Sequence, residues 1–162
     1  MKLNTIEILI PRQEKRNDTQ AFEVLNERIK DLFISVPAKK KIQNIWMELY
    51  QNMMKFRSSD HLSLFKLEID NLGLITLISM NYSRKINIET LQNKWNALQL
   101  SNDLKTDFQT KIQRKMINRT EKPGDFGLDF CFRYSKLRSF HRIARPDSQE
   151  IVYLAFSFPS YG

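Results

Sequence analysis

Residues 37–56 read PAKKKIQNIWMELYQNMMKF and carry the clearest periodic pattern in the chain. Apolar side chains recur there at three- and four-residue intervals, at Ile42, Ile45, Trp46, Leu49, Met53 and Phe56. This spacing places them along one side of an α-helix, which predicts an amphipathic helix packed against a core. Pro37 suits the first turn of that helix, because a first-turn amide has no partner within the helix.

Strand and helix patterns flank this segment. Residues 5–10 alternate apolar and polar side chains as a strand does, and Asp18 or Thr19 suits the N-cap of a following helix. Residues 62–70 and 72–80 predict two strands of an antiparallel hairpin, because both are rich in β-branched and apolar residues and a short turn separates them.

The second half of the chain adds more helices and strands. Helical spacing predicts two helices, with caps at Asn87 and Ser101, and residues 128–135 fit a helix and a strand equally well. Residues 137–144 and 151–158 predict a closing hairpin. The order of elements predicts a single α/β domain over residues 1–162, of the α+β two-layer sandwich kind. Helices pack on one face of a mixed, largely antiparallel sheet.

Composition narrows the class of protein. Of 162 residues, 41% are hydrophobic and 27% are charged, which is typical of a soluble globular domain. Cys131 is the only cysteine, which excludes an internal disulfide and a zinc cluster, and its aromatic-rich surroundings predict a buried thiol. No stretch has the length and apolarity of a signal peptide or a membrane helix. We therefore expect a cytoplasmic protein with no membrane partner.

The net charge of +8 raises the question of a polyanionic partner. Basic and aromatic side chains interleave between Arg133 and Arg145, a pattern that can bind bases and phosphates. An edge strand with an outward basic face has the same pattern and discourages aggregation. We favour the edge strand, because no recognised nucleic-acid-binding motif accompanies the charge, and we do not expect a nucleic-acid partner.

Two polar side chains on the long helix suggest a site. Glu48 and Asn52 are four residues apart, so they project from the same side of the helix, at the border of its apolar face. An amide oxygen is a hard ligand for Mg²⁺, and a carboxylate can accept a proton from a nucleophile. The same pair also occurs by chance on solvated helices.

The order of motifs resembles that of the histidine-kinase-type (GHKL, Bergerat-fold) ATPases, and within them the SiaB-like family of small bacterial protein kinases. The resemblance rests on Glu48-Leu-x-x-Asn52, a hairpin ending in Ser79-Met-Asn81, two helices, and the run from Pro123 to Asp129. It implies a Bergerat-type fold and an ATP-dependent serine/threonine kinase of a bacterial partner-switching system. ATP and Mg²⁺ would be its cofactors. Its partner would be a small protein, SiaC-like or anti-sigma-antagonist-like.

The resemblance also implies roles for particular residues. Glu48 matches the catalytic acid carried on the helix, and Asn52 matches the asparagine that ligates magnesium and contacts the nucleotide. Asn81 matches an asparagine that follows the second hairpin strand. Gly124 and Gly127 match glycines of the second phosphate-binding box. Phe56, by contrast, stands where many relatives have a histidine.

Several positions depart from that pattern. Met80 replaces a glycine, and Asp125, Phe126 and Asp129 replace small residues of the second box. A carboxylate about 5 Å from a phosphate charge costs around 3 kcal/mol at an effective dielectric constant of about 20. We therefore expect an eroded site that binds ATP and Mg²⁺ weakly or conditionally.

Three interpretations of the function stay open. The favoured one is a kinase-related regulator of a small protein, which remains an active kinase if Asp125 and Asp129 point away from the phosphates. The second is a pseudokinase or binding module that works without nucleotide. The third is a basic nucleic-acid-binding domain. The sequence leaves the oligomeric state open.

Overall fold

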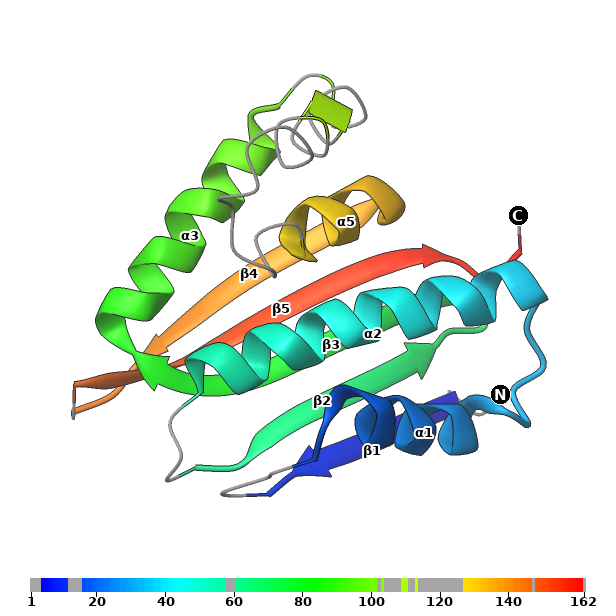
Figure 1. Ribbon diagram of the computed structural model, residues 1–162. Helices are drawn as coiled ribbons and strands as arrows, with labels where there is room; N and C mark the ends of the chain where they lie inside the picture. The colour runs from blue at the N-terminus through cyan, green and yellow to red at the C-terminus, as the bar shows by residue number, and fades with distance from the viewer. Residues whose placement is uncertain are drawn as a thin grey trace.

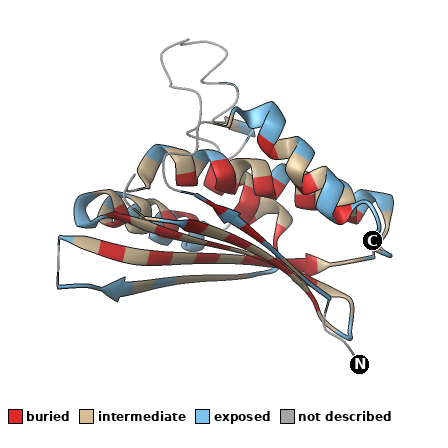
Figure 2. Ribbon diagram, turned by 90° about the horizontal axis from the view of Figure 1, so that it is seen from below, coloured by how far each residue is buried: buried red, intermediate tan, exposed pale blue. Residues whose placement is uncertain are grey.

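A computed structural model describes residues 4–11, 16–57, 61–101, 103, 109–110, 113, 127–146 and 148–161. Its five strands form one sheet, and the labelled helices lie together on one face of that sheet (Figure 1, Figure 2). The predicted α+β two-layer sandwich is confirmed. Each neighbouring pair of strands is antiparallel.

The strands run across the sheet in the order β1-β2-β3-β5-β4, so that β3 is central and β4 lies at an edge. Their bounds are Asn4–Ile10 for β1, Ser63–Ile69 for β2, Leu74–Arg84 for β3, Leu137–Ala144 for β4 and Gln149–Pro159 for β5. Buried and partly exposed residues alternate along β2 and β3. This period of two is what a sheet with one covered face requires.

The described helices are α1, Asp18–Ile29; α2, Val36–Phe56; α3, Lys85–Gln99; and α5, Gly127–Tyr134. The segment that fitted both a strand and a helix is therefore α5. The helix is favoured over the strand because it buries Leu128, Cys131 and Phe132 together on one side. The strand alternative would have placed Cys131 and Phe132 on opposite faces.

Three local predictions of caps and ends need correction. Asn17, rather than Asp18 or Thr19, caps α1, and it forms a capping box with Gln20. Asn87 does not cap α3, because that helix begins at Lys85 directly after β3. Strand β3 continues to Arg84, well beyond the expected end at residue 80, because it pairs with β5 throughout.

The longer β3 also changes the place of one site residue. Asn81 does not follow the strand but lies within it, opposite Val152. The helix predicted after Ser101 falls mostly on residues outside the described part of the chain.

The turn between β2 and β3 depends on two residues. The Asp70 carboxylate accepts hydrogen bonds from the amides of Leu72 and Leu74, both at 2.8 Å. Gly73 has a φ of 75°, a left-handed conformation that a residue with a Cβ adopts only with strain. The turn thereby fixes the register of the hairpin at the centre of the sheet.

Helix α2 is anchored to the sheet by Trp46. Its side chain is 1% exposed. The ring stacks on Tyr50 at 5.2 Å between centroids and meets Phe65 of β2 edge-on at 5.5 Å. Ser35 caps the helix by accepting a hydrogen bond from the amide of Ala38.

We predict that Trp46→Ala lowers the free energy of unfolding by about 3–5 kcal/mol, because it removes a large buried ring and leaves a cavity. Urea unfolding followed by circular dichroism measures the loss. Val36→Ala is the matched control, since Val36 lies on the same helix with 79% of its surface exposed, and it should change stability by less than about 0.5 kcal/mol. A loss below about 1 kcal/mol for Trp46→Ala would contradict the role given to α2.

Candidate functional site

Helix α2 presents Glu48 and Asn52 at the border of its buried face. Both are half-buried, while their neighbours Leu49 and Met53 are fully buried against the sheet. The packing of those neighbours fixes the rotation of the helix. As a result, the carboxylate and the amide face the space between the helices rather than bulk solvent.

The first residue of α5 lies against this pair. A Cβ at Gly127 would lie 2.7 Å from Oε2 of Glu48 and 3.2 Å from Nδ2 of Asn52. Real Cβ atoms do not approach a neighbour as closely as 2.7 Å, so a side chain at position 127 would displace the Glu48 carboxylate. The structure thus brings together Glu48, Asn52 and Gly127, three of the five predicted site residues. Gly124 lies outside the described residues.

Helix α3 contributes a cation to the same cleft. Nζ of Lys94 lies 3.6 Å from Oδ2 of Asp129, which is in the first turn of α5 and 3% exposed. Opposite charges at this distance attract strongly in a partly buried setting. The carboxylate of Asp129 is therefore balanced by a cation. The expected repulsion between Asp129 and a phosphate is correspondingly weaker than an unpaired charge would produce.

The pKa of Glu48 reflects this environment. Burial raises the pKa of its carboxyl group above the ordinary value, Lys94 acts in the opposite direction, and Asp18 adds a small increase. A carboxylate with a raised pKa is a better proton acceptor than an exposed one.

Cys131 lies on the buried side of α5. Burial raises the pKa of its thiol well above the usual range, with the charges of Glu48 and Asp129 adding to the effect. The side chain is fully buried. The expectation of a buried thiol is confirmed, and its chemistry is that of a neutral, unreactive sulfur.

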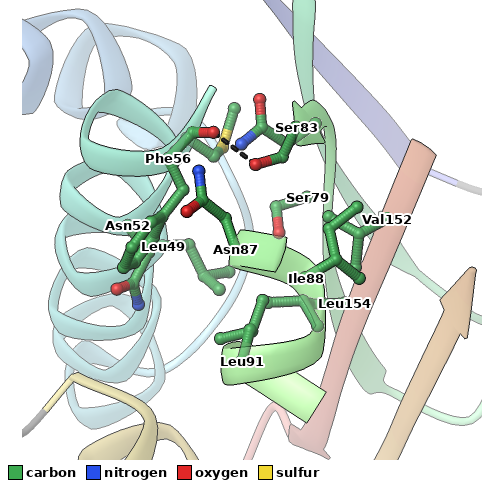
Figure 3. A pocket seen from close by; sticks show the side chains of 12 residues that line it. Leu49, Asn52, Phe56, Ser79, Ser83, Asn87, Ile88, Leu91, Val152 and Leu154 are labelled. Atoms are coloured by element: carbon green, nitrogen blue, oxygen red, sulfur yellow. Dashed lines mark hydrogen bonds between the residues drawn. The ribbon is translucent and has the colours of Figure 1, made fainter. Parts of the chain in front are cut away.

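A small cavity lies between α2 and α3, above β3 and β5, and Figure 3 shows side chains from these four elements around it. Asn52 lines one wall, while its amide points away from the polar groups of β3 and towards α5. Asn52 and Asn81 both line it, together with Leu49, Met53, Phe56, Ser79, Ser83, Asn87, Ile88, Leu91, Val152 and Leu154. About 20 Å³ is open to the centre of a water molecule, which is room for about one water.

The two asparagines of this cavity are held differently. Oδ1 of Asn81 accepts a hydrogen bond of 3.0 Å from the hydroxyl of Ser63. Nδ2 of Asn52 is buried and has no hydrogen-bond partner in the described part of the structure. A buried amide group without a partner costs free energy. With respect to the described residues, Asn52 therefore has hydrogen-bonding capacity left for a ligand.

Sequence reasoning missed Lys94, Ser63 and Asn87. Lys94 gave no signal, because a lysine on an amphipathic helix is usually solvated. Ser63 reaches Asn81 only because β2 and β3 are paired in this register. Asn87 joins Asn52 and Asn81 in the cavity wall only because α3 packs on the sheet. Asn87 was noticed, but as a helix cap rather than as part of a cavity wall.

The arginines of the basic stretch are engaged by the protein itself. Arg138 donates hydrogen bonds to the carbonyl oxygens of Phe132 and Ser135 at the end of α5. Arg142 forms an ion pair of 2.7 Å with Glu150 and also contacts Gln92. Both belong to β4, and the expected edge strand is confirmed. The expected outward basic face is wrong for these two arginines, because they pair with the buried Phe156 and Val152 and therefore lie on the face that the helices cover.

The donors near Asn52 limit how a cation could be held. Within the described ranges, no three histidine, cysteine or acidic side chains gather in a way that could bind a metal ion. The magnesium predicted at Asn52 would thus depend on one amide oxygen, with water and phosphate oxygens completing its shell. Mg²⁺ commonly binds nucleotide sites with few protein ligands.

Comparison with known proteins found no matching family model and no matching curated protein. Among solved structures, the fold is similar to that of a chain in the crystal structure of the SiaB–SiaC complex from Pseudomonas aeruginosa. The TM-score is 0.72 at 11% sequence identity, and the alignment covers 94% of this chain and 89% of that chain. The described helices include none with the length and hydropathy to cross a bilayer.

We predict that Glu48→Gln stabilises the protein at neutral pH. Because the folded-state pKa of Glu48 is raised above the ordinary 4.5, the folded protein binds this proton more tightly than the unfolded chain does. Stability is therefore lost as the pH rises above that value, and the amide variant avoids the loss. Its Tm should exceed that of the parent at pH 7.5, and the difference should shrink towards pH 3.5.

The matched control is Glu23→Gln, which makes the same change at an exposed position of α1. It should leave the pH dependence of Tm unchanged. Equal pH profiles for Glu48→Gln and the parent would show that the Glu48 carboxylate is not held in an unfavourable environment.

Proposed function

We propose that the chain is a SiaB-like signalling protein that regulates a small protein partner and binds ATP and Mg²⁺ weakly or conditionally. The proposed site lies in the cleft formed by α2, β3, α3 and α5. The proposal includes membership of the Bergerat-fold ATPases. The approach of Gly127 to Glu48 and Asn52 carries the proposal. The resemblance requires these three residues to meet, whereas the position of Gly127 in the sequence does not predict that it lies beside the other two.

The fold likeness supports the proposal independently. The similar chain belongs to a complex of SiaB with SiaC, and we extend to this chain the idea of a small, SiaC-like or anti-sigma-antagonist-like partner. The proposed site would lie in a cleft between helices, where a second protein could present a side chain to it.

In the proposed kinase reaction each residue has a separate task. Magnesium at Asn52 would hold the phosphates of ATP. Glu48 would accept the proton of a serine or threonine hydroxyl as its oxygen bonds to the γ-phosphorus. The bond from that phosphorus to the β,γ-bridging oxygen breaks and ADP leaves. The raised pKa of Glu48 suits this role. Lys94 would offset negative charge in the cleft.

The size of the cavity supports conditional binding. Room for about one water next to Asn52 and Asn81 is far below the volume of a nucleotide base. Nucleotide binding therefore requires the walls of the cavity to move. The free energy of that opening lowers the apparent affinity, as it does whenever the binding-competent state is a minor one.

A second candidate is a binding module that works without nucleotide. The closed cavity and the tight contact of Gly127 with Glu48 favour it, because both leave little room for phosphates in the described conformation. A nucleic-acid-binding role has less support, since Arg138 and Arg142 are already bound to protein groups.

Calorimetric titration with ATP, in the presence and absence of Mg²⁺, tests the proposal. We predict that the parent binds ATP weakly and more tightly with Mg²⁺. Asn52→Ala should remove the magnesium dependence, with a loss on the order of tenfold or more in affinity for Mg-ATP. Asn44→Ala is the matched control, because Asn44 is an exposed asparagine on the same helix.

Two outcomes would count against the proposal. Equal magnesium dependence in the parent and in Asn52→Ala would remove Asn52 as the ligand. The absence of any ATP binding by the parent, with a protein partner still bound, would favour the module that works without nucleotide.

A salt series separates this proposal from nucleic-acid binding. We predict that a generic oligonucleotide binds the parent only at low ionic strength. Non-specific binding to phosphates weakens by orders of magnitude between about 50 and 200 mM salt as counterion release loses its advantage. Fluorescence titration measures this, and tight binding that persists at physiological salt would favour the nucleic-acid interpretation.

A further inference from the structure

The face of the sheet that points away from the helices is apolar at its centre. The labelled helices all lie on the opposite face (Figure 2). Strand pairing places Leu64, Met80 and Tyr153 side by side in one row across β2, β3 and β5. Leu9 of β1 extends this row at one edge, where its side chain is 60% exposed. An antiparallel sheet with one solvated face ordinarily places polar residues there.

The neighbouring rows enlarge the apolar area. On one side of the Met80 row, Ile78 of β3 pairs with Ala155 of β5. On the other side, Tyr82 pairs with Ile151, which pairs with Ile143 of β4. Ile143 is 47% exposed. These three rows form the centre of the open face, and at their edges they also hold the polar residues Glu7, Lys66, Ser139 and His141. Their apolar residues are Leu9, Leu64, Ile78, Met80, Tyr82, Ile143, Ile151, Tyr153 and Ala155.

Charged side chains flank the apolar centre of the open face. Towards one end, Lys66 and Glu7 continue the Ile78 row on β2 and β1, and Glu68 lies one row further out. Nζ of Lys66 lies 2.6 Å from the carboxylate of Glu68 and 3.9 Å from that of Glu7, and two carboxylates with one ammonium group leave this end acidic. Towards the other end, Arg84 is exposed at the last position of β3, and the guanidinium of Arg145 lies 5.5 Å from the centroid of the Tyr82 ring. This end is basic.

This arrangement is complementary to itself. The Met80 row lies midway between the row of Glu68 and the row of Arg84. A two-fold axis that crosses the strands at the Met80 row would therefore place the acidic end of one copy over the basic end of the other. The same rotation would place the apolar rows against one another, with the central strand β3 over its own counterpart. A symmetric dimer needs such a self-complementary surface.

The area also fits. Strands of 7 to 11 residues, spaced about 4.8 Å apart with a rise of about 3.4 Å per residue, give the whole face of the sheet, its charged ends included, roughly 700 Å². Stable protein interfaces bury about 800 Å² on each partner. Two twisted sheets that pack face to face in this way form the sandwich geometry common in β-proteins.

We propose that the open face is the interface of a symmetric homodimer, in which it packs against the same face of a second copy about a two-fold axis that crosses β3 near Met80. The proposal is independent of the nucleotide site, which lies on the other side of the sheet. It leaves the cleft between the helices free for a different partner.

Sedimentation velocity on the full chain, from about 1 to 100 µM, tests the proposal. The parent is expected to give a sedimentation coefficient that corresponds to twice its chain mass of 19.3 kDa. Met80→Lys places two like charges near the axis and should raise the dissociation constant of the dimer at least about tenfold. Ile86→Lys is the matched control, because Ile86 is an apolar residue of α3 that is 65% exposed and lies off this face, and it should leave the dimer intact.

Charge exchange tests the orientation and does not depend on the folding of Met80→Lys. Glu68→Arg and Arg84→Glu should each weaken the dimer, and the double variant should recover most of the parent's affinity, because the proposed rotation brings Glu68 of β2 to the level of Arg84 on the neighbouring strand β3 of the other copy. A parent that stays monomeric at 100 µM would overturn the proposal. Equal dimer dissociation constants for Met80→Lys and Ile86→Lys would overturn it as well. A double variant weaker than both single variants would overturn the proposed axis.

Discussion

The burial of the apolar face of α2 against the middle of the sheet is the contact on which the rest of this structure depends. Trp46, Leu49 and Met53 are 3% exposed or less, and they meet the sheet through rings and aliphatic chains that leave no rotational freedom to the helix. Because the helix cannot rotate, the direction of every polar residue on its flanks is fixed as well. The candidate site is thus a consequence of core packing rather than of a dedicated loop.

This origin explains the chemistry of the cleft. Glu48 and Asn52 stand one helical turn apart at the edge of the core, where they are partly desolvated. That desolvation raises the pKa of Glu48, and the amide nitrogen of Asn52 has no partner among the residues that the structure describes. Both effects cost folding free energy. Residues that a protein holds in an unfavourable environment are often those that it uses on a ligand, which agrees with the role we propose for this pair.

The two faces of the sheet divide the functions that we propose. The covered face carries the helices, the cavity and the cluster of Glu48, Lys94 and Asp129. The open face carries an apolar centre between charged ends and has no described chemistry of its own. A protein arranged in this way can associate through one face and bind a ligand or a different partner on the other side. Association on one face does not directly obstruct binding on the other. Both surfaces include side chains of β3, which alternate between the two faces.

The sequence alone determined the layer structure, because hydrophobic period is a local property. The period of α2 and the alternation in the hairpin predicted the elements, and their order predicted helices on one face of a sheet. Local reasoning also placed Glu48 and Asn52 on one flank of a helix. It is wrong at the ends of elements. It predicts Asn87 as a helix cap and the end of β3 at Met80, whereas β3 continues to Arg84 and α3 begins at Lys85. The end of β3 depends on pairing with β5, and the last pair, Arg84 with Gln149, joins residues 65 positions apart in the chain.

Only the tertiary structure decided which residues meet. Gly127 lies 75 residues beyond Asn52, and the contact between them exists because α5 packs on α2. Lys94 joined the site because α3 lies beside α5, and it balances the very carboxylate, Asp129, that the sequence presented as an unopposed charge. The row that joins Leu64, Met80 and Tyr153 likewise exists only once three strands are in register. The physical reason is the same in each case: propensity and period act over a few residues, whereas a site or an interface needs side chains that only the packing of distant segments brings within contact distance.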